Sequence, residues 1–393
     1  MAAVLYRCIV PLLAFLMVGT VVAQQRDMRV GLLQDLKVKR CMVMTKRGVY
    51  DVFVDGKKVT QITSVDGLKV ERTSNGLVCK TLSQTFSGKQ SIDLRSRQKD
   101  SAFRLRSLDH KMAERAFDGS LEVRIAGDAL LLVNNVDLER YVEGVVLSEA
   151  GRHQYLEYYK LQAVSCRTYA LTNQRKHIPE GFQVCDRVHC QVYKGRNFVD
   201  SIAQAVMETR NMVLVDSDIR LIHATFHSNC GGETTNAEDV WSKEEVYLRG
   251  TVDTFCVAGE HARWTRRIPR QEWLRYLKGT HQVDITSSAQ LFPLLDQQPS
   301  CRGIYLNTTP PLIPLKQVRA DWKLNSAYFS IRSDAEYVVL EGRGFGHGVG
   351  VCQEGAMEMA RKGFTFTDIL HYYYAEVHLV DLGSLDFFRD LGR

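Results

Sequence analysis

The stretch Tyr141-Val-Glu-Gly-Val-Val-Leu-Ser-Glu-Ala150 lies where a strand-like part of the sequence gives way to helical periodicity. Lys160 and Arg167 follow Glu149 at offsets of 11 and 18 residues, close to three and five whole α-helical turns. One unbroken helix would place this carboxylate and both cations along a single stripe. Gly151 argues against one helix. We therefore expect two helical segments, 139–150 and 155–176, and expect Glu149 to reach the two cations through the fold.

Before this stretch, short alternating or β-branched segments run from Met28 to about Leu130. Turn pairs such as Asp55-Gly56 and Asn75-Gly76 separate them, as expected for successive strands. The predicted fold class is α+β. It comprises a β-rich N-terminal module (24–119), a mixed α/β domain (120–382) and a C-terminal tail (383–393).

The first residues have the pattern of a secretory signal peptide. Arg7 precedes an apolar run from Cys8 to Val22, and Ala23 ends that run with a small residue. The run is too short and too soon interrupted for a membrane span. We expect cleavage near Ala23 and an exported protein, periplasmic or associated with the cell envelope.

The composition and net charge limit the classes of binding partner that we expect. Hydrophobic residues make up 45% of the chain and charged residues 24%, which is ordinary for a globular protein. The formal net charge is +6, and no Lys/Arg block is interleaved with aromatic residues, so nucleic acid is not expected as a partner. An acidic polymer outside the cytoplasm, such as cell wall, would suit the sign of the charge.

Two glycine-bearing turns contain polar side chains. Residues 342–350 alternate glycine with other residues around His347, but match neither a dinucleotide fingerprint nor a phosphate loop. They indicate either a site-lining loop or a structural turn. His227 and Ser228 invite a serine-hydrolase interpretation, yet neighbours on a strand face opposite ways and no Gly-x-Ser-x-Gly elbow occurs.

Nine cysteines follow the predicted leader, and an odd number leaves at least one without an intramolecular disulfide. Cys185, His189 and Cys190 lie within six residues, with His177 nearby, which suggests either a zinc site or a short disulfide or free thiols. Cys41 with Cys79, and Cys230 with Cys256 or Cys352, are further pairings that the sequence leaves open. Cys166 falls on the apolar face of its predicted helix, where a buried, inert thiol is the common case.

Four motifs occur in order along the chain. They are Tyr141-Val-Glu-Gly-Val-Val-x-x-Glu149, Lys160-Leu-Gln-Ala-Val-x-x-Arg-Thr-Tyr-Ala-Leu171, His227-Ser-x-Cys-Gly-Gly-x-Thr234 and Gly344-x-Gly-His-Gly-Val-Gly-x-x-Gln-x-Gly-Ala356. Together they resemble the family of stage II sporulation protein D and the related amidase enhancers (the SpoIID/LytB domain). The resemblance covers roughly residues 120–382.

The resemblance implies a peptidoglycan lytic transglycosylase, with Glu149 as the catalytic acid/base and Lys160 and Arg167 lining the cleft. Further substrate contacts are then expected from residues of the same motifs: Gln162, His227, Ser228, Gly231, Gly232, His347 and Gln353. No cofactor is required for catalysis. A structural zinc on Cys185, Cys190, His177 and His189 is implied because some members bind zinc just after the second motif.

Such an enzyme cleaves between MurNAc and GlcNAc and leaves 1,6-anhydroMurNAc ends, using one carboxyl group that must be protonated at the working pH. We therefore expect Glu149 to be partly buried. The alternatives are a non-catalytic glycan-binding protein or amidase enhancer, with an N-acetylmuramoyl-L-alanine amidase as partner, and a zinc- or thiol-dependent hydrolase. Departures from the family pattern are Ala150-Gly151 after the glutamate, Cys352 in place of a serine, and Tyr374-Ala-Glu after His371-Tyr-Tyr.

Overall fold

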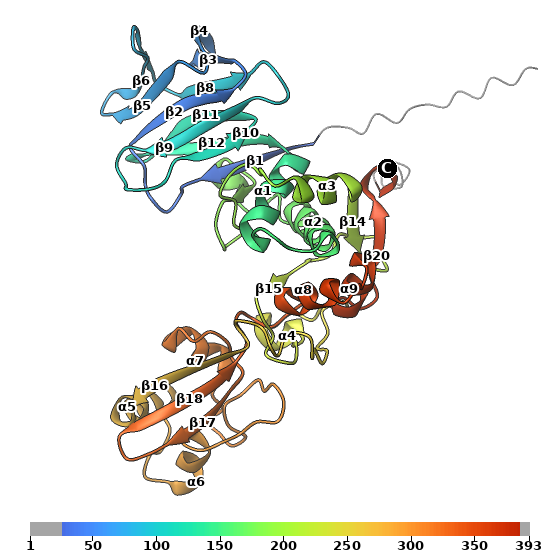
Figure 1. The fold of residues 1–393 in the computed structure, drawn as a ribbon. Helices are drawn as coiled ribbons and strands as arrows, with labels where there is room; N and C mark the ends of the chain where they lie inside the picture. The colour runs from blue at the N-terminus through green and yellow to red at the C-terminus, as the bar shows by residue number, and fades with distance from the viewer. Residues whose placement is uncertain (1–25, 386–393) are drawn as a thin grey trace, which may run out of the picture.

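The computed structural model describes residues 26–385, and the predicted leader lies outside them. Figure 1 shows two layers of strands at one end, a helical region in the middle, and a separate lobe of strands and helices at the other end. Strands and helices are thus both abundant, and the predicted α+β class is confirmed. Among the described residues, no helix combines the length and the apolar character needed to cross a membrane.

The first sheet has seven strands in the order β13-β1-β12-β11-β8-β3-β4. All neighbours pair antiparallel except β1 and β13. The strands are β1 (Asp27–Leu32), β3 (Tyr50–Val54), β4 (Lys57–Ile62), β8 (Ser91–Ser96), β11 (Ser120–Ala126), β12 (Ala129–Asp137) and β13 (Val184–Cys185). The module boundary expected at residue 119 therefore falls inside a sheet, because β11 and β12 pair with β8 and β1 of the N-terminal part.

The second sheet has six strands in the order β10-β9-β2-β5-β6-β7. They are β2 (Arg40–Arg47), β5 (Gly67–Thr73), β6 (Gly76–Lys80), β7 (Thr85–Gly88), β9 (Ala102–Ser107) and β10 (Arg115–Asp118). Alternate side chains point inward, as the period of two requires. Tyr50 of the first sheet meets Phe103 of the second edge to face at 6.2 Å, so the two sheets share one aromatic core.

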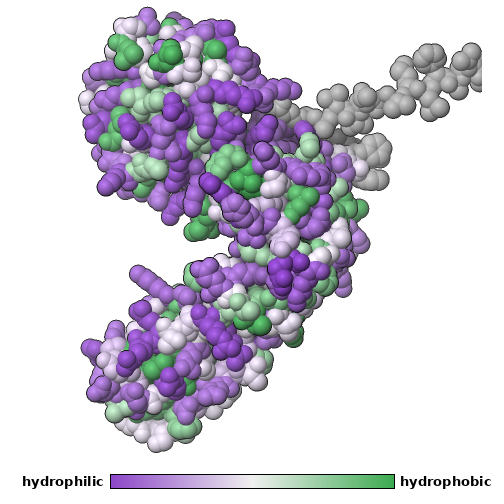
Figure 2. Space-filling view, in the orientation of Figure 1, coloured by the Kyte–Doolittle hydropathy of each residue, from purple (hydrophilic) through white to green (hydrophobic). Residues whose placement is uncertain are grey.

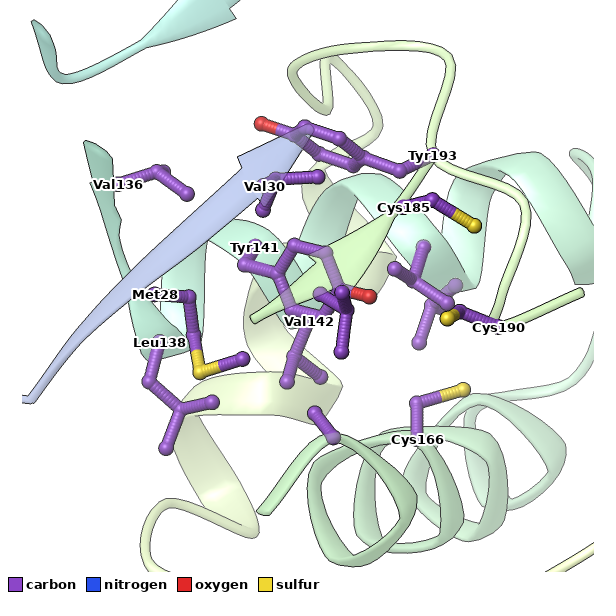
Figure 3. Close-up of a cluster of buried hydrophobic side chains, with 14 of the residues drawn as sticks. Met28, Val30, Val136, Leu138, Tyr141, Val142, Cys166, Cys185, Cys190 and Tyr193 are labelled. Atoms are coloured by element: carbon purple, nitrogen blue, oxygen red, sulfur yellow. The ribbon is translucent and has the colours of Figure 1, made fainter. Parts of the chain in front are cut away.

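Helix α1 (Leu138–Ala150) begins directly where β12 ends. The Asp137 carboxylate caps it by accepting hydrogen bonds from the N–H groups of Glu139 and Arg140. Gly151 ends it with φ +70°, and α2 (Leu156–Thr172) starts five residues later. The predicted break at Gly151 is confirmed. Figure 3 shows Tyr141 and Val142 packed with Met28 and Val30 of β1 and with Cys166 of α2.

Other elements complete the helical region. They are α3 (Asp200–Glu208), β14 (Met212–Val215), β15 (Phe226–His227), α4 (Ala237–Trp241), β19 (Val351–Cys352), α8 (Gln353–Arg361), α9 (Phe366–Tyr373), β20 (His378–Asp381) and the short helix Ile178–Glu180. β14 pairs with β20, and β15 with β19. The second pairing joins two sequence motifs more than a hundred residues apart.

Arg167 lies in the middle of this region and is fully buried. Its Nε and Nη2 donate to the Glu139 carboxylate of α1, at 3.0 and 2.5 Å. Its Nη1 donates to the Met212 carbonyl of β14 at 3.0 Å. One guanidinium thus fastens α2 to α1 and to β14.

Residues 263–343 form a lobe with its own hydrophobic core, inserted between α4 and the glycine loop. Its sheet has the order β16-β18-β17, all antiparallel. The elements are β16 (Arg263–Pro269), α5 (Arg270–His281), α6 (Ser288–Leu291), a short helix (Phe292–Leu294), α7 (Leu315–Trp322), β17 (Phe329–Ser333) and β18 (Tyr337–Arg343). The molecule is hollowed between this lobe and the N-terminal sheets (Figure 2).

Replacing Arg167 by leucine should lower the free energy of unfolding by about 3–5 kcal/mol, because the Glu139 carboxylate would stay largely buried without its partner. Lys160→Ala is the control. That ammonium group pairs with two partly exposed carboxylates, and its loss should cost less than about 1 kcal/mol. Urea denaturation of both variants checks this. Equal costs would contradict the role assigned to Arg167.

Candidate functional site

A cavity of about 560 Å³ lies where α1, the loop after β13, β15 and the glycine loop meet. Its lining includes five residues that the motifs predict for the site: Glu149, His227, Ser228, His347 and Gln353. The rest of the lining is Tyr169, Lys176, Val188, His189, Cys190, Gln191, Thr225, Phe226, Trp241, Phe345 and Gly346. The fold therefore brings residues of all four motifs to one cavity, the second motif through Tyr169.

Glu149 lies in the last turn of α1 and is half-buried. Its Oε1 accepts a hydrogen bond from the Val192 N–H at 2.8 Å. Burial raises the pKa of the Glu149 carboxyl, while this N–H and the Lys194 ammonium oppose the rise. The partial burial expected for a carboxylic acid that donates a proton is present.

The loop that carries Val192 is fastened to α1. A Cβ at Gly144 would lie 2.3 Å from the Gly195 carbonyl oxygen, so this close approach requires glycine. The Ser148 hydroxyl accepts from the Lys194 N–H at 3.0 Å. The hydrogen bond from Val192 to Glu149 is thus held by two further contacts between the same loop and the same helix.

His227 and His347 face each other with ring centroids 5.3 Å apart. Val349 N–H donates to Nδ1 of His347, so Nε2 of His347 carries the proton and donates to the Phe226 carbonyl at 3.0 Å. Burial lowers the pKa of His347 to about 4, and burial together with the neighbouring His347 lowers the pKa of His227 well below its usual range. Both imidazoles are therefore neutral at neutral pH.

Several polar atoms of the lining are buried and have no hydrogen-bond partner within the described residues: Thr225 Oγ1, His227 Nε2 and Gln353 Nε2. The His227 ring places Nδ1 3.2 Å from the Val349 carbonyl, so Nδ1 donates and Nε2 is left as an acceptor. Because unpaired buried polar groups are costly, these atoms indicate a ligand that is rich in hydroxyl and amide groups.

The sequence reasoning missed the aromatic part of the lining. Trp241 is 45% exposed and lies 5.0 Å from the His347 ring, and Phe345 is 39% exposed. Exposed aromatic faces beside polar groups suit a partly apolar, partly hydroxylated ligand. An isolated tryptophan in a sequence carries no such signal, whereas Phe345 lies between two glycines of the fourth motif and was open to inference.

Five other predicted contacts lie outside this lining, and two of them are the cations Lys160 and Arg167. Lys160 pairs with Glu157 and Glu208 at 2.8 Å each, and Arg167 is buried on Glu139. Neither cation lines the cavity, so the expectation that they accompany Glu149 is wrong. Lys160 and Arg167 do share one face of α2, as their seven-residue spacing predicts. That face contacts α3 and α1 and does not face the cavity.

Gln162 is also buried away from the cavity, where its Nε2 donates a hydrogen bond to the Tyr158 hydroxyl of the same helix at 3.1 Å. Gly231 and Gly232 lie behind the cavity wall, where Gly231 packs against Arg343. These three residues support neighbouring structure and do not contribute to the lining.

The predicted zinc ligands do come together. One ligand atom each from His177, Cys185, His189 and Cys190 lies within 4.8 Å of all the others. Nδ1 of His189 is 3.9 Å from both sulfur atoms, and neighbouring ligands of a tetrahedral zinc lie roughly 3.3–3.8 Å apart. Figure 3 shows Cys185 and Cys190 on the segments beside Tyr141.

His177 strengthens the fit. Its Nε2 is buried without a hydrogen-bond partner among the described residues, while its Nδ1 contacts the Glu180 carboxylate at 2.5 Å. A carboxylate on the far nitrogen is the usual support of a zinc-bound imidazole. The residues present therefore fit a closed, structural zinc site.

Comparison with known proteins follows the same motifs. A family model described as SpoIID, stage II sporulation protein, matches residues 126–215. An uncharacterised protein of Brachyspira hyodysenteriae is 30% identical over 283 residues, which cover 68% of this chain and 73% of that protein. Stage II sporulation protein D of Bacillus subtilis is 29% identical, with 62% of this chain and 74% of that protein covered. The amidase enhancer of Bacillus subtilis is 24% identical, with 59% and 39% covered.

The raised pKa of Glu149 predicts how stability depends on pH. A carboxyl group whose pKa is higher in the folded than in the unfolded state loses its stabilising contribution as the pH rises from its ordinary value through the folded value. The free energy of unfolding of the wild type, minus that of Glu149→Gln, should therefore fall over this window by about 1.4 kcal/mol per unit of pKa shift. Urea denaturation at successive pH values measures it, and a difference that rises with pH would contradict the burial of the carboxylate.

Proposed function

Because the chain belongs to the stage II sporulation protein D family, we propose that it is a peptidoglycan lytic transglycosylase with Glu149 as the general acid and base. The observation that supports this most directly is the position of one carboxyl group of raised pKa in a cavity lined by both polar and aromatic side chains. Among the cavity-lining residues within 26–385, Glu149 is the sole carboxylic acid. A retaining or inverting hydrolase of the usual kind would need two.

One carboxyl group is enough for the proposed reaction. Protonated Glu149 donates its proton to the glycosidic oxygen as the bond to C1 of the muramic sugar breaks. The resulting carboxylate takes the proton of the sugar's own 6-hydroxyl, and O6 bonds to C1. The products are a 1,6-anhydro end and a free 4-hydroxyl on the neighbouring sugar. No water is consumed, and Glu149 ends protonated as it began.

The rest of the lining suits a glycan strand. Nε2 of neutral His227 accepts a hydrogen bond from a hydroxyl or N-acetyl N–H, and Nε2 of Gln353 donates to an oxygen. Trp241 offers an apolar face for a sugar ring. Lys176 adds a cation to the lining, and peptide-bearing strands carry carboxylates. Because this substrate lies outside the cytoplasmic membrane, the proposal includes export by the leader expected at residues 1–23.

A second candidate is a non-catalytic glycan-binding protein that assists an N-acetylmuramoyl-L-alanine amidase. The similarity to the amidase enhancer of Bacillus subtilis favours it. Such a protein would use the same cavity for binding and would have no need of a protonated Glu149.

Zinc on His177, Cys185, His189 and Cys190 has a structural role in this proposal. When bound, it would supply a cross-link between the loop after β13 and the residues that precede β13. His189 and Cys190 line the cavity, and Val192, two residues further on, donates to Glu149. The cluster therefore positions the donor that holds the carboxyl group, while the proton transfers involve Glu149 alone.

Glu149→Gln should lower the rate of glycan cleavage by at least about 100-fold, because the amide has no acidic proton to donate. The full chain is incubated with purified glycan strands, and the new ends are identified by mass spectrometry. Anhydro ends are expected. Reducing ends would indicate a hydrolase, and intact strands that still bind would favour the amidase enhancer.

Glu143→Gln is the matched control for this variant. Glu143 lies on the same helix, burial also raises its pKa, and it lines a different cavity with Arg140. It should retain cleavage within a few-fold. Equal cleavage by Glu149→Gln and wild type would exclude Glu149 as the acid.

The double variant Cys185→Ser/Cys190→Ser should lose one zinc per chain and should exchange the amide hydrogen of Val192 faster, because the loop is no longer cross-linked. Metal analysis and hydrogen exchange measure the two effects. Cys301→Ser, at an exposed thiol, is the control and should change neither. Unchanged zinc content in the double variant would contradict a metal at this cluster.

A further inference from the structure

A second cluster of metal-ligating side chains lies behind the cavity wall, and none of its members lines the cavity. One ligand atom each from Cys230, Asp253, Cys256 and Cys352 lies within 4.8 Å of all the others. All four residues are completely buried. They come from three segments: the turn after β15, the loop after α4, and β19.

The contacts within the cluster are close. The sulfur atoms of Cys230 and Cys256 are 3.3 Å apart, and Cys230 Sγ is 3.3 Å from Oδ2 of Asp253. Neighbouring thiolate ligands of a tetrahedral zinc lie roughly 3.8 Å apart, and the sulfurs of a disulfide about 2.05 Å apart. The arrangement needs to open by only a few tenths of an ångström to hold a metal. A disulfide would use two of the three thiols and leave Cys352 and Asp253 unexplained.

The surroundings suit thiolates. The Cys230 N–H donates to Sγ of Cys352 at 3.2 Å. Arg302 supplies a cation next to the cluster, where its Nη2 donates to the Cys230 carbonyl at 2.6 Å. The Asp253 carboxylate is oriented by the Tyr373 hydroxyl at 2.9 Å. Supporting hydrogen bonds of this kind are typical around bound metals.

We propose that Cys230, Asp253, Cys256 and Cys352 form a second, closed zinc site with three thiolates and one carboxylate. Three sulfur ligands select a soft, thiophilic metal, and a buried tetrahedral set without an open position indicates a structural role. Binding releases the three thiol protons to solvent and changes no oxidation state. This inference does not depend on the catalytic proposal.

The positions of the four ligands in the chain show which segments the metal would connect. Cys256 lies seven residues before β16, where the chain enters the lobe of 263–343, and Cys352 lies nine residues after β18, where it leaves. Ser228 and Gln353 of the cavity lining lie two residues and one residue from ligands Cys230 and Cys352. The metal would therefore link the two chain segments that enter and leave the lobe, and it would fix the position of one wall of the cavity.

The test is the zinc content of the full chain, purified without added thiol and measured by inductively coupled plasma mass spectrometry. We expect Cys256→Ser and Asp253→Asn each to contain one zinc per chain fewer than wild type. The double variant Cys185→Ser/Cys190→Ser removes the other cluster and should retain the zinc lost in Cys256→Ser. Cys301→Ser, at an exposed thiol, should match wild type. The two sites are thereby counted separately, so failure at one is distinguishable from failure at the other.

A second measurement uses the wild-type protein, so it remains informative if the variants do not fold. Wild-type protein is alkylated before and after removal of zinc by a chelator, and the modified cysteines are identified by peptide mass spectrometry. Cys230, Cys256 and Cys352 should resist alkylation until zinc is removed, and should then react on unfolding without reductant. Recovery of a Cys230–Cys256 disulfide, or wild-type zinc content in folded Cys256→Ser, would overturn the proposal.

Discussion

The buried guanidinium of Arg167 is the contact on which the helical region depends. It is fully buried, its charge is balanced by the Glu139 carboxylate of α1, and its remaining donors reach the backbone of β14 and α3. A buried charge tolerates little displacement of its partners, because an unpaired charge in the interior is costly. The axis of α1 is thereby fixed relative to α2. Because Glu149 lies about three turns after Glu139 on the same helix, its position is fixed as well.

The cavity wall opposite α1 is formed by the segments that carry His227, Ser228, His347 and Gln353. It is assembled from short segments, with β15 and β19 only two residues long each. Two clusters of cysteine with histidine or aspartate lie directly behind such segments, one beside the loop that reaches Glu149 and one beside the turn that carries Ser228. Where chain segments are too short to hold each other by regular hydrogen bonding, cross-links between side chains are the available means of fixing them. Both clusters lie where the backbone needs that support.

The motifs predicted the parts of the site that local sequence determines. Glu149, His227, Ser228, His347 and Gln353 were expected together and do line one cavity, and Gly151 does separate α1 from α2. Lys160 and Arg167 were misplaced, because helical spacing shows that two residues share a face but not what that face meets. Trp241 was missed because its meeting with His347 depends on a contact across more than a hundred residues. The boundary expected at residue 119 falls inside the first sheet for a related reason: β11 and β12 have strand-like sequences, but the sequence does not say which strands they pair with.

The location of Lys160 and Arg167 outside the cavity also affects the protonation of Glu149. A lysine and an arginine beside Glu149 would stabilise its carboxylate and lower its pKa, which would leave less of the acid form at neutral pH. In the structure, burial dominates, one backbone N–H contacts the carboxyl group, and Lys194 is the cation that opposes the rise. The neutral state of His227 and His347 works in the same direction, since an imidazolium ion facing the cavity would again favour the carboxylate. A site that must begin its reaction with a protonated glutamate is better served by polar, uncharged neighbours. The cationic stripe inferred from helical spacing would have opposed the step that Glu149 is proposed to perform.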